Sequence, residues 1–321
     1  MRARSSPVAR RTLMASVVIG ACLTLLSPMS GASSAKAGTQ TSPRTAQINS
    51  GRPAVAAPHV TSETATSGTL RATVSYVFLP KRSRYYVRLA VERDGRQIYD
   101  ERVRSVSRPG AWNQPIGVWR TQGLRSARTI TLRDLDGDGE PEILLEFWYG
   151  GAHCCFWTRV YRWDESRGSY TNIAHIWGNV DYRLADLHRV GRLELVTADD
   201  RFAYAFTSFA GSGFPIEIWD YRRGRLVNTT RTYGDAIARD AARQWRWYGE
   251  ARRRGWEVRG LLAAWAADEC LLGHSASALA WLQRHQFVLT APNEQQPSAS
   301  RRAYLKSLRA FLYRTGYLRE P

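Results

Sequence analysis

Apolar and polar residues alternate with two different periods in two long stretches of the chain. From Leu70 to about residue 232, short segments alternate with a period of two, which is typical of half-buried β-strands bounded by turns. After about Asp235 the period lengthens to 3.6, as on one face of an amphipathic helix. The pattern therefore predicts a β domain over residues 69–232 and an α-helical domain over residues 235–321.

The first part of the β domain predicts an irregular hairpin region. Residues 72–78 alternate, and residues 85–91 form a second such segment. Asp94-Gly95 is a dipeptide typical of a two-residue hairpin turn, and it leads into residues 97–103.

Two similar units follow, and they are offset by 52 residues in the sequence. They share an acidic residue at each end of one loop and a glycine between them: Asp134 and Asp186, Gly139 and Gly191, Glu142 and Glu194. Strands are predicted in the first unit at residues 129–132, 142–149, 156–163 and 170–177, and in the second at 182–184, 203–208 and 216–221. The offset is that of an internal repeat of blade-like units.

Four helices are expected in the α-helical domain. Two apolar stripes come first, made of Ile237, Ala241, Trp245 and Tyr248, and then of Val258, Leu262 and Trp265. A third helix is predicted over residues 275–285. Ser298 can cap the last helix, and Gly316 can end it. Its apolar face carries Tyr304, Leu308, Phe311 and Leu312.

The residues before the β domain predict export. Arginines precede the apolar segment Leu13 to Leu26, and Ala35-Lys36-Ala37 is a cleavage-like site, so residues 1–37 are identified as a signal peptide. Residues 38–68 are rich in Ser, Thr, Ala and Pro, which predicts a disordered linker. No transmembrane segment is expected in the mature chain, because later apolar runs are too short. We therefore expect a secreted or cell-envelope-associated protein.

Two details leave the export route open. Arg10-Arg11 directly before the apolar segment also permits a twin-arginine signal. Cys22 lies in a lipoprotein-like box, although apolar residues continue beyond it.

The mature chain is strongly basic. The net charge is +18, and residues 1–37 carry five basic and no acidic residues, which leaves +13. Anionic cell-wall polymer is a partner that such a charge can favour, whereas an exported protein meets little nucleic acid, and none is expected as a partner. Arginine makes up 43 of the 46 basic residues, and such a preference for arginine over lysine is also typical of a GC-rich genome.

Three cysteines remain after the signal peptide: Cys154, Cys155 and Cys270. Export makes a disulfide plausible, and an odd number leaves one thiol over. Neighbouring cysteines rarely bond each other, because the resulting ring is strained. The predicted disulfide therefore joins Cys270 to Cys154 or Cys155.

The segment from Asp134 to Glu142 carries the clearest chemistry. It reads D-x-D-x-D-G-x-x-E, with ligand candidates at Asp134, Asp136, Asp138, Glu140 (through its carbonyl) and Glu142. Ca²⁺ binds six to eight oxygens, and clustered carboxylates would repel one another without a cation. An EF-hand is excluded, because Leu145 stands at the twelfth position and Pro141 opposes an exiting helix.

This loop resembles the calcium loops of FG-GAP/VCBS repeats in integrin-like β-propellers, in which it joins two strands of a blade. The resemblance covers roughly residues 128–232 and is specific at residues 134–142. In the second unit His188 and Val190 replace the second and third aspartates, so no calcium is expected there. The resemblance implies a structural Ca²⁺ and a role in adhesion or ligand binding.

Residues 70–232 are too few for a complete propeller, which needs at least four four-stranded blades. The expected fold class is therefore α+β: an open β assembly of two blade-like units plus the irregular hairpin region. An all-helical C-terminal domain follows it and covers an exposed edge or face.

Three functional hypotheses follow. The sequence favours a secreted, calcium-stabilised, non-catalytic protein that binds cell-wall polymer or an extracellular protein or glycan. The rival is an exported hydrolase or thiol/redox protein, using His153 with Cys154 or Cys155, or a carboxylate pair such as Glu142 and Glu146. The third is a structural envelope protein held by its positive charge.

Overall fold

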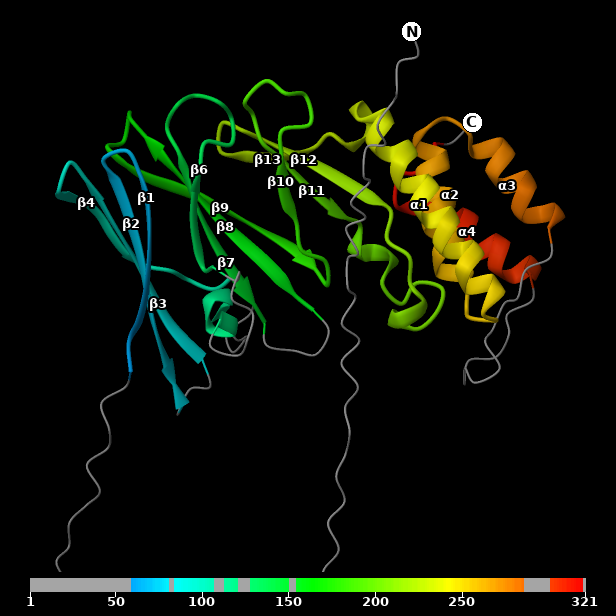
Figure 1. The fold of residues 1–321 in the computed structure, drawn as a ribbon, viewed down its shortest axis with the longest axis horizontal. Coiled ribbons are helices and arrows are strands. Elements are labelled where there is room, and N and C mark those ends of the chain that lie inside the picture. The colour runs from blue at the N-terminus through cyan, green and yellow to red at the C-terminus, as the bar shows by residue number, and fades with distance from the viewer. Residues whose placement is uncertain are drawn as a thin grey trace, which may run out of the picture. The chain divides into compact units, whose positions relative to one another are not determined.

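The computed structural model describes residues 59–80, 84–106, 113–120, 128–149, 154–285 and 301–319. The predicted signal peptide, residues 38–58 of the predicted linker, His153 and the predicted helix cap Ser298 lie outside these ranges. The described residues form three antiparallel β-sheets followed by four α-helices (Figure 1). The predicted α+β class with a helical C-terminal region is confirmed.

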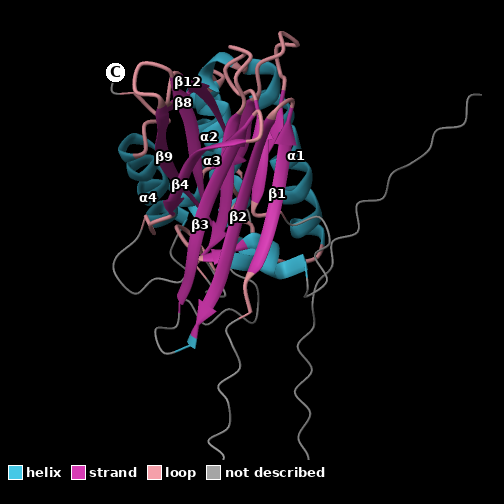
Figure 2. Cartoon of the chain, turned by 90° about the vertical axis from the view of Figure 1, so that its left-hand side faces the viewer, coloured by secondary structure: helices cyan, strands magenta, loops and turns pink. Residues whose placement is uncertain are grey.

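The first sheet is a four-stranded meander, in the order β1-β2-β3-β4 (Figure 2). Its strands are β1 (Thr61–Ser67), β2 (Leu70–Leu79), β3 (Arg84–Arg93) and β4 (Arg96–Arg102). Asp94 and Gly95 both have positive φ, of 51° and 75°, and form the predicted hairpin turn.

One prediction at the start of this sheet is wrong. Residues 61–67 were expected in the disordered linker, but they form β1 and pair with β2 along their whole length. The predicted hairpin region is part of a four-stranded meander, and its pairing shifts register between Val91 and Glu92, where β3 pairs with β4. Residues 61–67 read TSETATS and lack an apolar face, so their strand depends on backbone pairing with the apolar β2.

The second sheet has the order β5-β7-β8-β9, and β6 also pairs with β7. Its strands are β5 (Gln114–Pro115), β6 (Ile130–Arg133), β7 (Glu142–Trp148), β8 (Phe156–Asp164) and β9 (Ser169–Gly178). The third sheet is the meander β10 (Arg183–Ala185), β11 (Glu194–Ala198), β12 (Ile216–Arg222) and β13 (Arg225–Asn228). The two predicted units therefore correspond to two separate sheets.

The predicted strand at residues 203–208 is wrong. A short 3₁₀ helix, η3 (Asp200–Phe202), precedes this segment, and turns follow, with Tyr204 at a φ of 59°. Phe202 is buried in the helical core, and Phe206 packs against that core. The alternation in this segment therefore reflects aromatic anchoring to helices and not pairing in a sheet.

The sheets are stacked face to face, and the side chains of β7 show this best. Ile143, Leu145 and Phe147 share one apolar core with the first sheet. Leu144, which points to the opposite face, shares a second core with Leu195 of the third sheet. Burial of both faces explains why β7 is almost continuously apolar.

The helices lie beyond the third sheet, and the first of them, with the end of the second, packs on its far face (Figure 1). They are α1 (Gly234–Arg253), α2 (Arg259–Leu271), α3 (Ser275–Arg284) and α4 (Arg301–Arg314). Ile216 and Ile218 of β12 pack with Ala236 and Ile237 of α1. The described strands form open sheets without a closed ring. Within the same ranges, the structure contains no helix that is both long and apolar enough to cross a membrane.

Candidate metal centre and polar cleft

The acidic loop joins β6 to β7 and curls around the carboxylate of Asp134. That carboxylate accepts hydrogen bonds from the backbone N–H of Gly137 (2.7 Å) and of Gly139 (2.9 Å). Both glycines have positive φ, of 75° and 89°, a conformation that residues with a side chain rarely adopt. The backbone N–H of Leu135 donates to Glu142 Oε2 at 3.0 Å and closes the loop onto β7.

The aspartates of the loop meet at one point. Oxygen atoms of Asp134, Asp136 and Asp138 lie within 4.8 Å of one another. Beside them, Asp136 Oδ1 and Glu142 Oε1 are buried and accept no hydrogen bond from the described residues. Several convergent carboxylate oxygens, two of them without a donor, fit a hard divalent cation.

Glu142 is the most enclosed of these groups, with a fully buried side chain. Burial, and to a smaller extent the nearby aspartates, raise the pKa of the carboxyl to about 8, although the hydrogen bond from Leu135 opposes the rise. A bound cation would favour the ionised form and so reverse this effect.

Two arginines also contact the loop. Arg93 of β3 forms an ion pair with the Glu140 side chain, which leaves the Glu140 carbonyl as its predicted ligand atom. Arg162 of β8 donates to Asp138 Oδ2 at 2.8 Å, and its Nε lies 3.9 Å from oxygens of both Asp136 and Glu142. Arg162 was not among the predicted site residues, although the predicted pairing of residues 142–149 with residues 156–163 could have placed it beside the loop.

The second loop has the same backbone design but keeps only the first of the three aspartates, Asp186. Asp186 Oδ2 accepts from the N–H of Gly191 (2.9 Å), and Glu194 Oε2 accepts from the N–H of Leu187 (2.7 Å). These bonds match those of Asp134 with Gly139 and of Glu142 with Leu135, at the same offset of 52 residues. The internal repeat is therefore visible in hydrogen bonds as well as in sequence.

The predicted disulfide between Cys270 and Cys154 or Cys155 is wrong. Cys154 and Cys155 form a disulfide with each other. Cys270 is a free, buried thiol on α2, in the apolar core shared by the helices. Cys270 is buried in the apolar core of the helices, whereas Cys154 and Cys155 immediately precede β8 in the second sheet, so the predicted partners lie in different layers of the fold.

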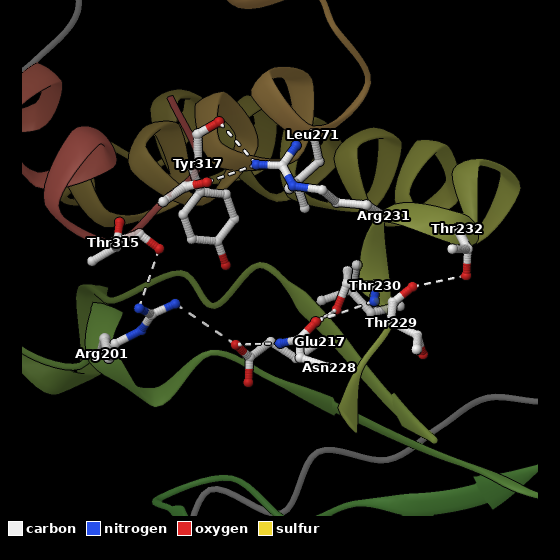
Figure 3. Close-up of a pocket in the computed structure, with 12 residues that line it drawn as sticks. Arg201, Glu217, Asn228, Thr229, Thr230, Arg231, Thr232, Leu271, Thr315 and Tyr317 are labelled. Carbon is white, nitrogen blue, oxygen red and sulfur yellow. Dashed lines mark hydrogen bonds and ion pairs between the residues drawn. The ribbon is translucent and has the colours of Figure 1, made fainter. Parts of the chain in front are cut away.

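A polar cleft lies where the third sheet meets the segment after α4 (Figure 3). It consists of two adjoining cavities of about 350 Å³ and 340 Å³, and Arg201, Glu217 and Asn228 line both. Buried Asp199 accepts hydrogen bonds from the Arg201 guanidinium (2.6 Å) and from the Tyr317 hydroxyl (3.0 Å).

Glu217 lies at the centre of this cleft. Its carboxylate has only long contacts: 3.3 Å to Trp219 Nε1, 3.3 Å to Asn228 Nδ2 and 3.7 Å to Arg201. Burial, and then the charge of Asp199, raise the pKa of Glu217 to about 7. No sequence motif marks this site, because its side chains come from segments more than 100 residues apart.

Comparison with known proteins finds similarity to a family described as the sll0997 C-terminal domain, over residues 237–316. A probable thylakoid lumen protein of Synechocystis sp., sll0997, is 28% identical over 156 residues, which is 45% of this chain and 44% of that protein. The uncharacterized protein y4bJ of Sinorhizobium fredii is 27% identical over 150 residues, 43% of this chain and 22% of that protein. The chain thus spans less than half the length of either relative.

A solved structure of a Xanthomonas protein related to type IV secretion shares 12% identity. It covers 52% of this chain and 92% of its own, with a TM-score of 0.21, too low to support a conclusion about fold. The family match covers most of the helical region and does not include the acidic loop.

Proposed function

We propose that this is an exported, calcium-stabilised, non-catalytic binding protein of the bacterial envelope or its surroundings. The observation that carries the proposal is the acidic loop, in which three aspartates converge. One oxygen of Asp136, and one of the neighbouring Glu142, are buried and lack a hydrogen-bond donor among the described residues. Removal of a cation would leave these oxygens buried and mutually repelling, so its binding stabilises the folded state.

Export is supported by the signal-like segment at residues 1–37. It is also in keeping with the name of the Synechocystis relative, a probable thylakoid lumen protein. Outside the cytoplasm, free calcium reaches concentrations that fill even weak extracellular sites. The partners that we propose are anionic cell-wall polymer or an extracellular protein or glycan, bound by a basic surface of FG-GAP/VCBS-like sheets.

The rival hypothesis of a thiol nucleophile has less support. Cys154 and Cys155 are bonded to each other, and Cys270 is buried. In the alternative carboxylate pair, Glu146 accepts from Thr158 and Tyr182. Glu142 accepts from Leu135 with Oε2, and its Oε1 belongs to the acidic loop.

Calorimetric titration of the mature chain with Ca²⁺, together with thermal unfolding, tests the proposal. Calcium at 100 times its dissociation constant should raise the free energy of unfolding by about 2.7 kcal/mol relative to EDTA. Asp136→Ala should abolish this response, because it removes an oxygen that has no other partner.

Asp94→Asn is the matched control. It changes an aspartate of a hairpin turn at a positive φ, which asparagine also adopts readily, and it should leave the calcium response unchanged. No heat of calcium uptake at millimolar concentration, with equal melting temperatures in calcium and EDTA, would refute the proposal.

A further inference from the structure

The two cavities that meet at Glu217 form one cleft with four walls. Glu217 lies on β12 and Asn228 ends β13, while Arg201 comes from η3 and Thr315 to Tyr317 follow α4 (Figure 3). Each cavity, of about 350 Å³ or 340 Å³, falls in the size range of small-molecule sites. We propose that this cleft binds a neutral saccharide.

The charges of the cleft favour an uncharged ligand. The Arg201 guanidinium is held by Asp199 and by the carbonyl of Thr315 (3.2 Å). Arg231 donates to the carbonyl of Gly316 at 2.6 Å. An anion would therefore compete with bonds that these cations already make and would also face the carboxyl groups of Glu217 and Asp200. An organic cation would meet two guanidinium groups. A ligand without charge meets neither penalty.

The unused hydrogen-bonding capacity suits hydroxyl groups. Glu217 has contacts of 3.3 Å or longer, so its lone pairs can still accept strong hydrogen bonds from a ligand. The exposed side chain of Asn228 lies beside it: its Oδ1 already accepts from Thr230, but its Nδ2 carries a second N–H besides the one in the long contact with Glu217. The hydroxyls of Thr229 and Thr232 line the same wall and already donate, to Asp220 (2.8 Å) and to the Thr229 carbonyl (2.9 Å), so they offer acceptor oxygens to a ligand. A ring that carries several hydroxyls can satisfy carboxylate, amide and hydroxyl partners together.

One wall is aromatic. His175 and Trp219 line the second cavity, both are partly exposed, and their ring centroids are 4.7 Å apart. Burial lowers the pKa of His175, so its ring is neutral near pH 7. A sugar ring presents C–H groups on its faces and hydroxyls at its edges, which matches an aromatic wall next to polar groups.

The cleft is built for binding without cleavage. Hydrolysis of a glycosidic bond uses two carboxyl groups that both reach the substrate. Asp199 is 2% exposed and is engaged by Arg201 and Tyr317. Asp200, which also lines the second cavity, accepts hydrogen bonds at 2.9 Å from the backbone N–H and the side-chain amide of Asn179. Of these three carboxylates, Glu217 is the one whose contacts are all 3.3 Å or longer, so it is the one that we expect to contact a ligand.

The inference names a ligand for the binding role proposed above, and its site is separate from the acidic loop. Titration of the ¹⁵N-labelled mature chain with tetrasaccharides of N-acetylglucosamine and of glucose, followed by NMR, tests it in calcium buffer. At least one probe should shift the Trp219 indole signal in a saturable way. Trp219→Ala should weaken that binding about tenfold, by loss of one aromatic contact.

Trp256→Ala is the matched control, because Trp256 is 53% exposed and lines a different cavity. If Trp219→Ala fails to fold, Asn228→Ala, at an exposed position, should weaken binding instead. The proposal is overturned if no probe binds at millimolar concentration, or if Trp256→Ala lowers affinity as much as Trp219→Ala. Release of shorter saccharides would overturn the non-cleaving assignment. Calcium uptake measured on the same sample distinguishes these failures from failure of the calcium proposal.

Discussion

Glu146 links the second sheet to the third, because it bonds Tyr182, the residue that precedes β10. Its carboxylate, on β7, accepts hydrogen bonds from Thr158 Oγ1 (2.6 Å) and from the hydroxyl of Tyr182 (2.5 Å). Trp177 Nε1 donates to the same Thr158 hydroxyl at 2.8 Å. Burial raises the pKa of Glu146 from 4.5 to about 7, although the two bonds to its carboxylate oppose the rise.

The sign of the effect on stability follows from this pKa. Because the folded state takes up the proton more readily than the unfolded state, the contribution of Glu146 is intact below pH 4.5 and is lost as the pH rises towards 7. At 1.36 kcal/mol for each pH unit, the difference between 4.5 and about 7 corresponds to about 3 kcal/mol. Glu146→Gln keeps the shape and stays neutral, so it avoids this loss.

Urea unfolding at pH 5 and pH 8.5, in EDTA, tests the reasoning. Glu146→Gln should lie within about 1 kcal/mol of the wild type at pH 5 and be more stable by about 3 kcal/mol at pH 8.5. Glu101→Gln, at an exposed position on β4, is the control for loss of a carboxylate. Equal stability of Glu146→Gln and wild type at both pH values would refute the argument.

Two further predictions concern the helices. In urea unfolding, Gly260→Ala should lower the free energy of unfolding by about 1–3 kcal/mol or more, because the new Cβ would lie 2.7 Å from Ser212 Cα. Gly234→Ala is the control: no atom lies within 4 Å of its new Cβ, so the stability should stay unchanged. Burial raises the pKa of the Cys270 thiol to about 12, so a thiol reagent should label the native mature chain slowly and label one thiol per chain after denaturation. A fast-reacting thiol in the native protein would instead favour the thiol-enzyme hypothesis.

Local sequence patterns predicted much of the fold. The Asp94-Gly95 turn and the helical stripes have short-range signals, and the structure contains both elements. The curled shape of the acidic loop was also predictable, because it depends on glycines and carboxylates within nine residues. Calcium binding at this loop stays a prediction.

The errors arose where distant contacts decide the structure. Strand β1 has no apolar face and exists because β2 pairs with it. Phe202 and Phe206 alternate as strand residues would, but they pack against helices that come later in the chain. Arg162 and Glu217 acquire their surroundings from tertiary contacts, which single-sequence patterns do not encode.

The polar cleft has a consequence for the order in which the protein folds. The strands of each sheet pair mostly with close neighbours in the chain, so the sheets can form early and from local contacts. By contrast, Arg201 reaches Thr315 across 114 residues, and Asp199 reaches Tyr317 across 118 residues. Loop closure over such lengths comes late, and we therefore expect the cleft to be completed only after the last helix has docked. A chain that ends before residue 315 would keep its sheets but lack one wall of the cleft.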